Sequence, residues 1–366
     1  MGIDAKPRQN MHDRVDLCQA LPLSQPIYIT VDPSFLCNIK CVFCGGTFIR
    51  ANDPHTLKNG IMPYETFTHI IDSLAEFSKP LKSIRLYNHG EPLVNPDFAR
   101  MVKYAVDSGY VEGVMTVSNG LLFTQERSKE ILDAGINEIM ISVNGLSDEQ
   151  FYLMTKTKVN FKKYYENLKF LYSIKGDCVL RLKFVNELFA NDDEKKRCIE
   201  IFGEICDALI FESLYEWSGL DAPRNTPENI QAIKMACECN NKLDFPHFTP
   251  DHNIARAEVF YRDLGNGSDK LVCPRIFYSL AINADGSVSI CCGDGYHQLL
   301  CGDVNKNTIK EIWNSTKLKS YQIAHLKGKR RNMKHCRDCR GLKYFVIDNI
   351  DDCREGILER INNQRK

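Results

Sequence analysis

Short β-rich runs alternate with longer amphipathic stretches from residue 27 to about residue 215, and this alternation constrains the fold more than any other feature of the chain. The expected strands cover residues 27–31, 83–87, 114–118, 138–143, 179–185 and 208–212. Expected helices lie between them, near residues 64–78, 96–108, 124–134, 160–174 and 192–206. Such alternation indicates repeated βα units around a parallel sheet.

The repeat is too short for a complete barrel, since about six βα units fall short of the eight that close a TIM barrel. The sequence therefore predicts an α/β fold, a partial (βα)6 TIM-like barrel that is open on one side. Boundary signals support the helices: Pro63, Pro96 and Thr124 lie at expected starts, and Gly109 and Gly135 at expected ends. The functional site should lie at the carboxyl ends of the strands.

The chain changes character after the barrel, where prolines and a turn-prone Gly-Asn-Gly-Ser sequence at 265–268 predict a linker. Beyond it, an Asp-Gly turn between two β-rich runs predicts a hairpin over 277–291, followed by an amphipathic helix near 308–325. The expected organisation is an N-terminal extension over 1–26, the barrel over 27–218, an irregular linker over 219–270, and a small C-terminal domain over 271–366.

Charge and hydropathy exclude several classes of protein. The 366 residues carry 47 basic and 47 acidic side chains, which argues against a coat for nucleic acid or for an anionic membrane. No apolar run reaches the roughly 18 residues of a transmembrane helix, and the start of the chain lacks a secretory pattern. Sixteen cysteines without an export signal favour reduced thiols for metal or redox chemistry, and so a cytoplasmic protein.

Three of these cysteines, Cys37, Cys41 and Cys44, lie on one loop directly after the first expected strand. Three thiolates can hold three irons of a [4Fe–4S] cluster and leave the fourth iron open for a chelating ligand. The alternative is a structural zinc site on Cys41 and Cys44, but zinc needs a second pair of ligands close by.

The Cys-x3-Cys-x2-Cys spacing, with the aromatic Phe43 before the last cysteine and six βα units around it, resembles the radical S-adenosylmethionine (SAM) superfamily. The resemblance implies that the open iron chelates SAM and that an electron from the cluster cleaves it to methionine and a 5′-deoxyadenosyl radical. Cys37, Cys41 and Cys44 would then be the catalytic, cluster-binding residues, with Phe43 beside the cofactor.

Further landmarks of that family follow the next strands. His89-Gly90-Glu91-Pro92 resembles its Gly-Gly-Glu-Pro turn, which implies that Gly90 and Glu91 receive the ammonium group of SAM. Ser118-Asn119-Gly120 and Ile141-Ser142-Val143-Asn144-Gly145 resemble two later motifs, which implies that Ser118, Asn119, Ser142 and Asn144 border the cofactor. Asn144 replaces the usual Asp, so it cannot accept a proton.

Two further positions are open to more than one interpretation. Arg181 and Lys183 alternate to one face of the fifth strand, where a cation could hold the carboxylate of the cofactor or could face solvent. Arg181 is the cofactor-binding candidate of this pair. Glu216 and Trp217, just beyond the sixth strand, are candidates for substrate contact.

A second cysteine group lies in the C-terminal domain: Cys273, Cys291, Cys336 and Cys339. Four thiolates suit either zinc or an iron–sulfur cluster, and spacing alone does not decide. Their order around the hairpin resembles the auxiliary-cluster tail of the SPASM and twitch subfamilies. Because no further cysteine follows Cys339 at short spacing, the resemblance implies the twitch form with one auxiliary [4Fe–4S] cluster. Cys292 is an alternative to Cys291, and Cys353 is an alternative further ligand.

The resemblance implies that a carrier such as flavodoxin or ferredoxin supplies the electron and that the radical removes hydrogen from a substrate carbon. Twitch relatives include the dehydrogenase of 2-deoxy-scyllo-inosamine, so we expect oxidation of an alcohol in a sugar- or aminocyclitol-type small molecule, with the auxiliary cluster as electron acceptor. Neither nucleic acid nor a membrane is an expected partner. The alternatives are a peptide-modifying maturase of the same superfamily and a non-catalytic zinc-binding module.

Overall fold

The computed structural model describes residues 15–52, 60–214, 226–239, 242, 257–262, 270–337, 339, 341–342 and 348–363. Its centre is one ten-stranded sheet in the order β10-β9-β8-β1-β2-β3-β4-β5-β6-β7. The strands β1 to β7 run parallel, each beside the next. Their bounds are Tyr28–Val31, Ser83–Leu86, Val114–Ser118, Glu138–Val143, Val179–Val185, Ala208–Glu212 and Glu258–Arg262.

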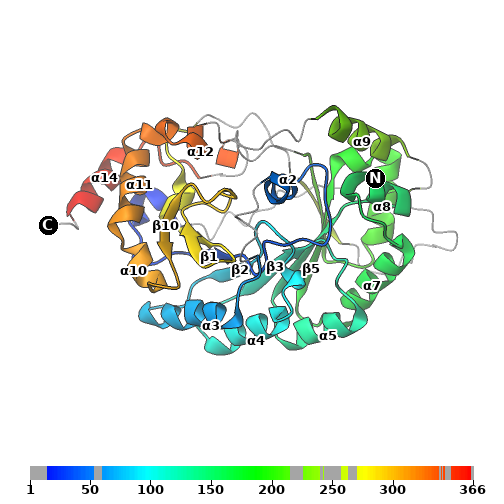
Figure 1. Cartoon of the computed structure of the whole chain (residues 1–366), viewed down its shortest axis with the longest axis horizontal. Coiled ribbons are helices and arrows are strands. Elements are labelled where there is room, and N and C mark those ends of the chain that lie inside the picture. The colour runs from blue at the N-terminus through cyan, green and yellow to red at the C-terminus, as the bar shows by residue number, and fades with distance from the viewer. Residues whose placement is uncertain are drawn as a thin grey trace.

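Helices cover the convex face of this curved sheet, as Figure 1 shows for α3, α4, α5, α7 and α8. Their bounds are Tyr64–Ser73, Phe98–Ser108, Gln125–Asp133, Phe161–Ile174 and Asp192–Phe202. The six predicted strands and five predicted helices are thus confirmed. The signals at Thr124 and Gly109 act as expected, since Thr124 Oγ1 caps α5 and Gly109 ends α4 with a left-handed φ of 67°.

The concave face of the sheet carries a small apolar cluster of its own. Met140, Ala208, Ile210 and Phe260 pack together there, with Val117 against them. Alternation along each strand puts these side chains on the face opposite the outer helices. They fill the inside of the partial barrel below the carboxyl ends of the strands, and so form the floor beneath the loops that follow those strands.

The predicted irregular linker over 219–270 is wrong for the parts that the structure describes. Helix α9 (Pro227–Glu238) lies in this segment, and β7 adds a seventh parallel strand beside β6. Thr226 caps α9 and Pro227 occupies its first turn, which are ordinary helix-start signals. Pro227, one of the prolines that suggested irregular chain, therefore marks a helix start instead.

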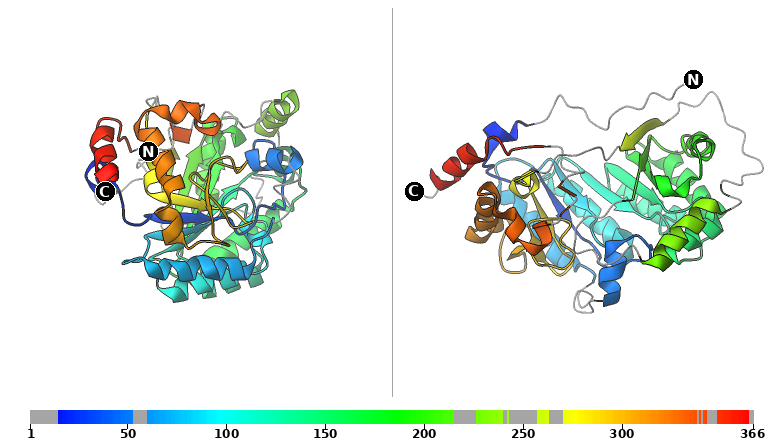
Figure 2. Two further views of the ribbon diagram at one scale, coloured as in Figure 1. Left: turned by 60° about the vertical axis from the view of Figure 1, so that its left-hand side comes forward. Right: turned by 90° about the horizontal axis from the view of Figure 1, so that it is seen from above.

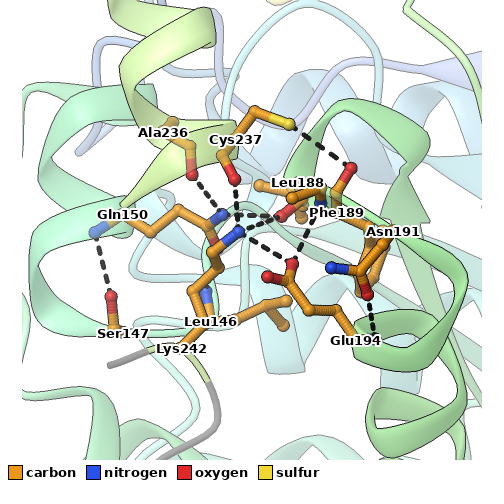
Figure 3. Close-up of polar contacts among 11 residues, drawn as sticks. Leu146, Ser147, Gln150, Leu188, Phe189, Asn191, Glu194, Ala236, Cys237 and Lys242 are labelled. Atoms are coloured by element: carbon orange, nitrogen blue, oxygen red, sulfur yellow. Dashed lines mark hydrogen bonds and ion pairs between the residues drawn. The ribbon is translucent and has the colours of Figure 1, made fainter. Parts of the chain in front are cut away.

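Buried polar contacts fix α9 to the barrel (Figure 3). Gln150, from α6 (Asp148–Thr155), donates through Nε2 to the carbonyl oxygens of Leu188 and Ala236 at 2.8 and 2.7 Å. Lys242 Nζ pairs with Glu194 at 2.8 Å, and its side chain is only 4% exposed. These contacts join α9 to the segments that follow β4 and β5.

The C-terminal region continues the barrel sheet. The predicted hairpin is confirmed as β8 (Ser279–Ile282) and β9 (Ser287–Ser289), and β8 pairs parallel with β1, opposite β2. The predicted helix near 308–325 is two helices, α10 (Ile309–Trp313) and α11 (Thr316–Leu326), because Ser315 caps a new helix start.

The remaining described elements are short, and several of them lie in the loops that follow the barrel strands. They are α1 (Leu17–Ala20), α2 (Gly45–Asn52), β10 (Leu300–Asp303), α12 (Lys334–Arg337), α14 (Arg354–Asn363) and the 3₁₀ turns η3 (Leu74–Glu76), η4 (Pro92–Val94), η5 (Asn186–Leu188), η6 (Pro274–Phe277) and η7 (Lys329–Asn332). Figure 2 shows α1 beside α14, where Arg360 donates to the carbonyl oxygen of Leu21 at 2.8 Å. In the described part of the chain, no helix is both long and apolar enough to cross a bilayer.

Candidate functional site

A cavity of about 300 Å³ opens at the carboxyl ends of the barrel strands. This volume lies at the lower end of the range for small-molecule sites. All predicted residues of the barrel site except Arg181 line it: Cys37, Cys41, Phe43, Cys44, Gly90, Glu91, Ser118, Asn119, Ser142 and Asn144. The structure therefore brings together residues that are spread over more than a hundred positions of sequence.

The three cysteines of the barrel lie on the loop between β1 and α2. Burial raises the pKa of Cys41 well above its usual range, and the nearby thiols of Cys44 and Cys37 add to this effect. Burial likewise raises the pKa of Cys37. A group of closely spaced thiols that includes Cys37 and Cys41 is suited to a cationic iron–sulfur core, because iron offsets both the burial and the mutual repulsion of thiolates.

A single metal ion fits less well than a cluster. Across the part of the chain that the structure describes, no three His, Cys, Asp or Glu side chains converge closely enough to hold one ion. In a cubane cluster each thiolate binds a different iron, so its ligands stand farther apart than the ligands of one zinc ion. The residues present therefore fit the predicted cluster.

Arg50 holds the cysteine loop against its neighbours, a role that the sequence analysis missed. Its Nη1 donates to the carbonyl oxygens of Phe35 and His89 at 3.0 and 2.9 Å. These bonds join α2 to the loops after β1 and β2. Asp32, at the end of β1, was also missed; it accepts from the backbone N–H of His89 at 3.3 Å, and burial raises its pKa to about 7. Neither residue belongs to a recognisable motif.

Glu91 is 2% exposed and is held by three donors. Ser118 Oγ donates to Oε1 at 2.7 Å, the backbone N–H of Asn119 donates to Oε2 at 2.8 Å, and that of Leu93 donates to Oε1 at 3.2 Å. Burial raises the pKa of this carboxyl to about 7, although the three hydrogen bonds act in the opposite direction. The turn after β2 thus presents a fixed carboxyl group to the cavity.

Position 90 requires a glycine because the backbone of residues 34–36 passes very close to it. A Cβ atom there would stand 2.0 Å from the carbonyl oxygen of Ser34 and 2.5 Å from that of Leu36. The close contact also allows the backbone N–H of Glu91 to donate to the carbonyl oxygen of Leu36 at 2.8 Å. The Gly-Glu pair therefore locks the turn after β2 against the loop that carries Cys37.

Asn119 connects this turn to the cysteine loop. Its Nδ2 donates to Asn38 Oδ1 at 2.7 Å and lies 4.0 Å from Cys37 Sγ. Tyr164, from α7, donates through its hydroxyl group to the carbonyl oxygen of Asn119 at 3.1 Å. The motif after β3 therefore contacts both Glu91 and the first cysteine.

Arg181 lies away from the cavity, whereas Lys183 lines it. Arg181 Nε pairs with Glu138 at 3.0 Å, at the amino end of β4, and so faces the lower part of the barrel. Lys183, two residues closer to the carboxyl end of β5, pairs with Glu212 at 2.9 Å, and both line the cavity. Periodicity places Arg181 and Lys183 on one face of β5 but does not give their depth in the barrel, and only Lys183 reaches the cavity.

The four cysteines of the tail group together. Burial raises the pKa of Cys273, and raises that of Cys336 to about 12, with the nearby thiol of Cys339 adding in both cases. The pKa of Cys291 is raised chiefly by a hydrogen bond with Cys292 and by burial, and Cys339 again contributes. Cys339 therefore lies near the other three thiols, as a four-ligand site requires, and none of the four lines the cavity.

The alternative ligands Cys292 and Cys353 have other partners. Cys292 accepts a hydrogen bond from Arg275 Nη1 at 3.0 Å. Cys353 forms a disulfide with Cys18, which contradicts the expectation that the cysteines are reduced. The other cysteines are free; Cys178, Cys198, Cys206 and Cys301 are buried, and Cys237 and Cys239 are half-buried. The candidates Glu216 and Trp217 lie outside the described residues.

The barrel site and the tail site meet at His89 and Gly295. A Cβ on Gly295 would stand 2.5 Å from Ile49 Cδ1, on α2, and 3.3 Å from His89 Cε1. Burial lowers the pKa of His89 to about 3, and His297, Arg50 and His335 lower it further. A neutral His89 therefore packs between the loops that carry the two cysteine groups.

Two family models match the chain. Residues 31–185 match the radical SAM superfamily, and residues 273–340 match the SPASM iron–sulfur cluster-binding domain. The first range covers the cysteine loop and β2 to β5, and the second covers all four tail cysteines. Both matches agree with the positions of the two sites.

Curated relatives match over part of their length. The AdoMet-dependent heme synthase of Methanosarcina barkeri is 30% identical over 113 residues, which are 31% of this chain and 30% of that protein. The tungsten-containing aldehyde ferredoxin oxidoreductase cofactor-modifying protein of Pyrococcus furiosus is 30% identical over 123 residues, 34% of this chain and 32% of that protein. The chain thus spans about a third of these relatives.

Solved structures share the fold over most of the chain. BtrN, in complex with AdoMet and 2-DOIA, superposes with a TM-score of 0.52 and 15% identity, over 88% of this chain and 96% of that one. SuiB of Streptococcus suis, bound to the precursor peptide SuiA, superposes with a TM-score of 0.58 and 13% identity, over 92% of this chain and 74% of that one. The AdoMet-bound anSMEcpe superposes with a TM-score of 0.54 and 16% identity, over 93% of this chain and 100% of that one. Each likeness shows the fold alone.

Proposed function

We propose a reaction for this chain, which is a radical SAM enzyme with an SPASM iron–sulfur domain: it oxidises an alcohol carbon of a sugar- or aminocyclitol-type small molecule. The observation that carries the proposal is that Cys339 lies near Cys273, Cys291 and Cys336, while Cys292 is bonded to Arg275 and Cys353 to Cys18. Four protein ligands leave no iron of a cubane cluster open for substrate. Such a cluster is suited to accept an electron rather than to bind the reacting molecule.

The barrel residues would hold the cofactors. Cys37, Cys41 and Cys44 would each bind one iron, and Glu91 would accept the ammonium group of SAM. Ser118 and Asn119 keep the Glu91 carboxyl in position through bonds of 2.7 and 2.8 Å. When bound and reduced, the cluster with SAM supplies the radical that removes a hydrogen atom from substrate.

The substrate side of the cavity carries opposite charges. Lys183 and Glu212 form an ion pair at the ends of β5 and β6, and Tyr87 and Asn88 line the cavity from the end of β2. Hydroxyl and amino groups of a small polar substrate can exchange hydrogen bonds with such a pair. Oxidation of an alcohol to a ketone removes a hydrogen atom, a proton and an electron from the substrate. The Glu212 carboxylate is our candidate for the proton acceptor.

The alternative within the same chemistry is a peptide-modifying maturase. It draws support from the fold likeness to SuiB, whose structure is bound to a precursor peptide. We further propose that a flavodoxin- or ferredoxin-type carrier supplies the electron and that the enzyme works in the cytoplasm.

The test is an anaerobic assay of the reconstituted full chain with SAM, a reductant, and a panel of sugars, aminocyclitols and short peptides. The proposal predicts that one small polyol loses two hydrogens, with one 5′-deoxyadenosine formed for each product. A Cys273→Ala variant should still form 5′-deoxyadenosine but no ketone. Modification of peptides only would replace the proposal by the maturase alternative.

A further inference from the structure

The segment 327–337 carries a concentrated positive charge on a chain with no net charge. It contains no acidic residue, whereas the whole chain balances 47 basic against 47 acidic side chains. Five of its cationic residues are exposed, and together they form what we name the basic surface: Lys327, Lys329, Arg331, Lys334 and Arg337. A local excess of this kind attracts an acidic partner over several ångströms.

Local structure keeps these cations directed outward. Gly328, with a φ of 70°, ends α11 and starts the turn η7. Arg330 is the exception in the segment, since it is 6% exposed and donates to the carbonyl oxygens of Lys270 and Cys336. Arg337 Nε donates to the carbonyl oxygen of Arg331 at 3.1 Å, which holds α12 against the turn. The buried arginine thus anchors the segment and leaves the basic surface to solvent.

The basic surface lies directly over the tail site. Cys336 belongs to α12 and is 8% exposed, between the exposed residues Lys334 and Arg337. Its thiol is near those of Cys273 and Cys339. A partner that binds the basic surface would therefore approach the tail thiols closely, which matters because electron transfer slows steeply with distance.

The chemistry of the segment favours a protein carrier over RNA. Proteins that bind single-stranded nucleic acid stack bases on exposed aromatic rings. The segment 327–337 contains no Phe, Tyr or Trp, and its one ring residue, His335, is 3% exposed. Within this segment charge is what remains for recognition, and the charge lies beside the tail thiols.

We propose that the basic surface docks an acidic one-electron carrier of the flavodoxin or ferredoxin type, which takes the electron from the tail cluster after each turnover. This inference rests on the proposed function, in which each oxidised alcohol leaves one electron on that cluster. The cluster is reoxidised, the carrier is reduced by that one electron, and no atom is transferred. The same carrier can then return the electron to the barrel cluster.

The test uses the full chain with Cys37, Cys41 and Cys44 replaced by Ala, so that only the tail cluster remains. The reduced tail cluster is mixed with oxidised flavodoxin, and its reoxidation is followed by stopped-flow absorbance at low and high salt. Lys329→Glu with Lys334→Glu should slow the second-order rate about tenfold at low salt, and the difference should vanish at high salt. The matched control is Lys162→Glu with Lys163→Glu, two exposed lysines on α7, which lies at the other end of the molecule from α12 (Figure 1).

Iron content and the circular dichroism spectrum check that the variants fold and keep the cluster. Equal rates for the two double variants would overturn the inference, as would the absence of iron from the triple-Ala chain. The surface would be assigned to RNA instead if an oligouridine strand bound in a salt-dependent way, and if Lys329→Glu with Lys334→Glu abolished that binding but left the rate with flavodoxin unchanged. The assay needs no alcohol, so failure to find a substrate leaves its result intact.

Discussion

The two cysteine groups of this molecule are built in opposite ways. The barrel group comes from one loop of eight residues, supplies three thiols and lines the cavity. The tail group comes from three separated segments, supplies four thiols and does not line it. Three ligands leave an iron open for a cofactor, and four leave none. This difference underlies the two roles that we propose, cleavage of SAM at the barrel group and electron transfer at the tail group.

Substitution of one cysteine in each group gives the largest contrast. Cys41→Ala should abolish formation of 5′-deoxyadenosine, because the open iron is lost with its cluster. Cys273→Ala should leave that formation within about twofold of the parent and stop the oxidation of substrate. Chromatography of 5′-deoxyadenosine measures the first effect. Retained cleavage in Cys41→Ala would break the assignment of the barrel site.

Gly90→Ala tests whether backbone contact really joins the two loops of the barrel site. The new Cβ would meet the Ser34 carbonyl oxygen at 2.0 Å, so we expect a loss of about 3 kcal/mol or more in the free energy of unfolding. Gly113→Ala is the control, since its Cβ would have no neighbour nearer than 3.8 Å and should change stability by under about 0.5 kcal/mol. Thermal unfolding measures both. Equal melting temperatures would contradict the geometry described for Gly90.

The buried carboxyl group of Glu91 should make SAM binding depend on pH. Its pKa is raised from 4.5 to about 7, so the free protein loses stability as the pH rises from about 4.5 to about 7. Binding of an ammonium group needs the ionised form, so affinity for SAM should rise roughly tenfold between about pH 5.5 and pH 7, below the range in which an α-amino group titrates.

Calorimetric titration of the reconstituted protein with SAM checks this pH dependence. The Glu91→Gln variant should bind SAM weakly, and its affinity for SAM should not change with pH. Asp32→Asn serves as the control, because Asp32 also has a pKa of about 7 but does not line the cavity. A slope that persists in Glu91→Gln and vanishes in Asp32→Asn would move the titrating group from Glu91 to Asp32.

The smallest expected effect separates neighbouring cysteines in the tail. Cys292→Ser should leave the iron content of the protein unchanged, because Cys292 bonds to Arg275. Cys291→Ser should remove about four irons per chain. Colorimetric iron analysis of the two variants distinguishes them. Loss of iron from Cys292→Ser alone would exchange their roles.

Sequence predicts the barrel site well because each of its motifs follows a strand whose carboxyl end reaches the same edge. The order of the strands alone is enough to predict that Glu91, Ser118 and Asn119 lie close together. Depth along a strand is a different matter: Arg181 and Lys183 share a face, and only the register with β4 and β6 shows that Lys183 reaches the cavity.

Long-range pairing explains the other differences. Nothing local to Cys18 or Cys353 indicates a disulfide across 335 positions of sequence. Likewise β7 contains the strand-favouring residues Val259 and Phe260, but local sequence does not show that it pairs with β6 across a segment rich in proline. Arg50 acts through backbone carbonyl oxygens of two other loops, a contact that carries no sequence pattern.

The central claim, one open and one closed cluster, is tested most directly by iron and sulfide content after anaerobic reconstitution. The parent chain should hold about eight irons and the Cys37/Cys41/Cys44 triple-Ala variant about four. About four irons in the parent and none in the variant would contradict the account, because the tail would then hold no iron cluster to accept an electron.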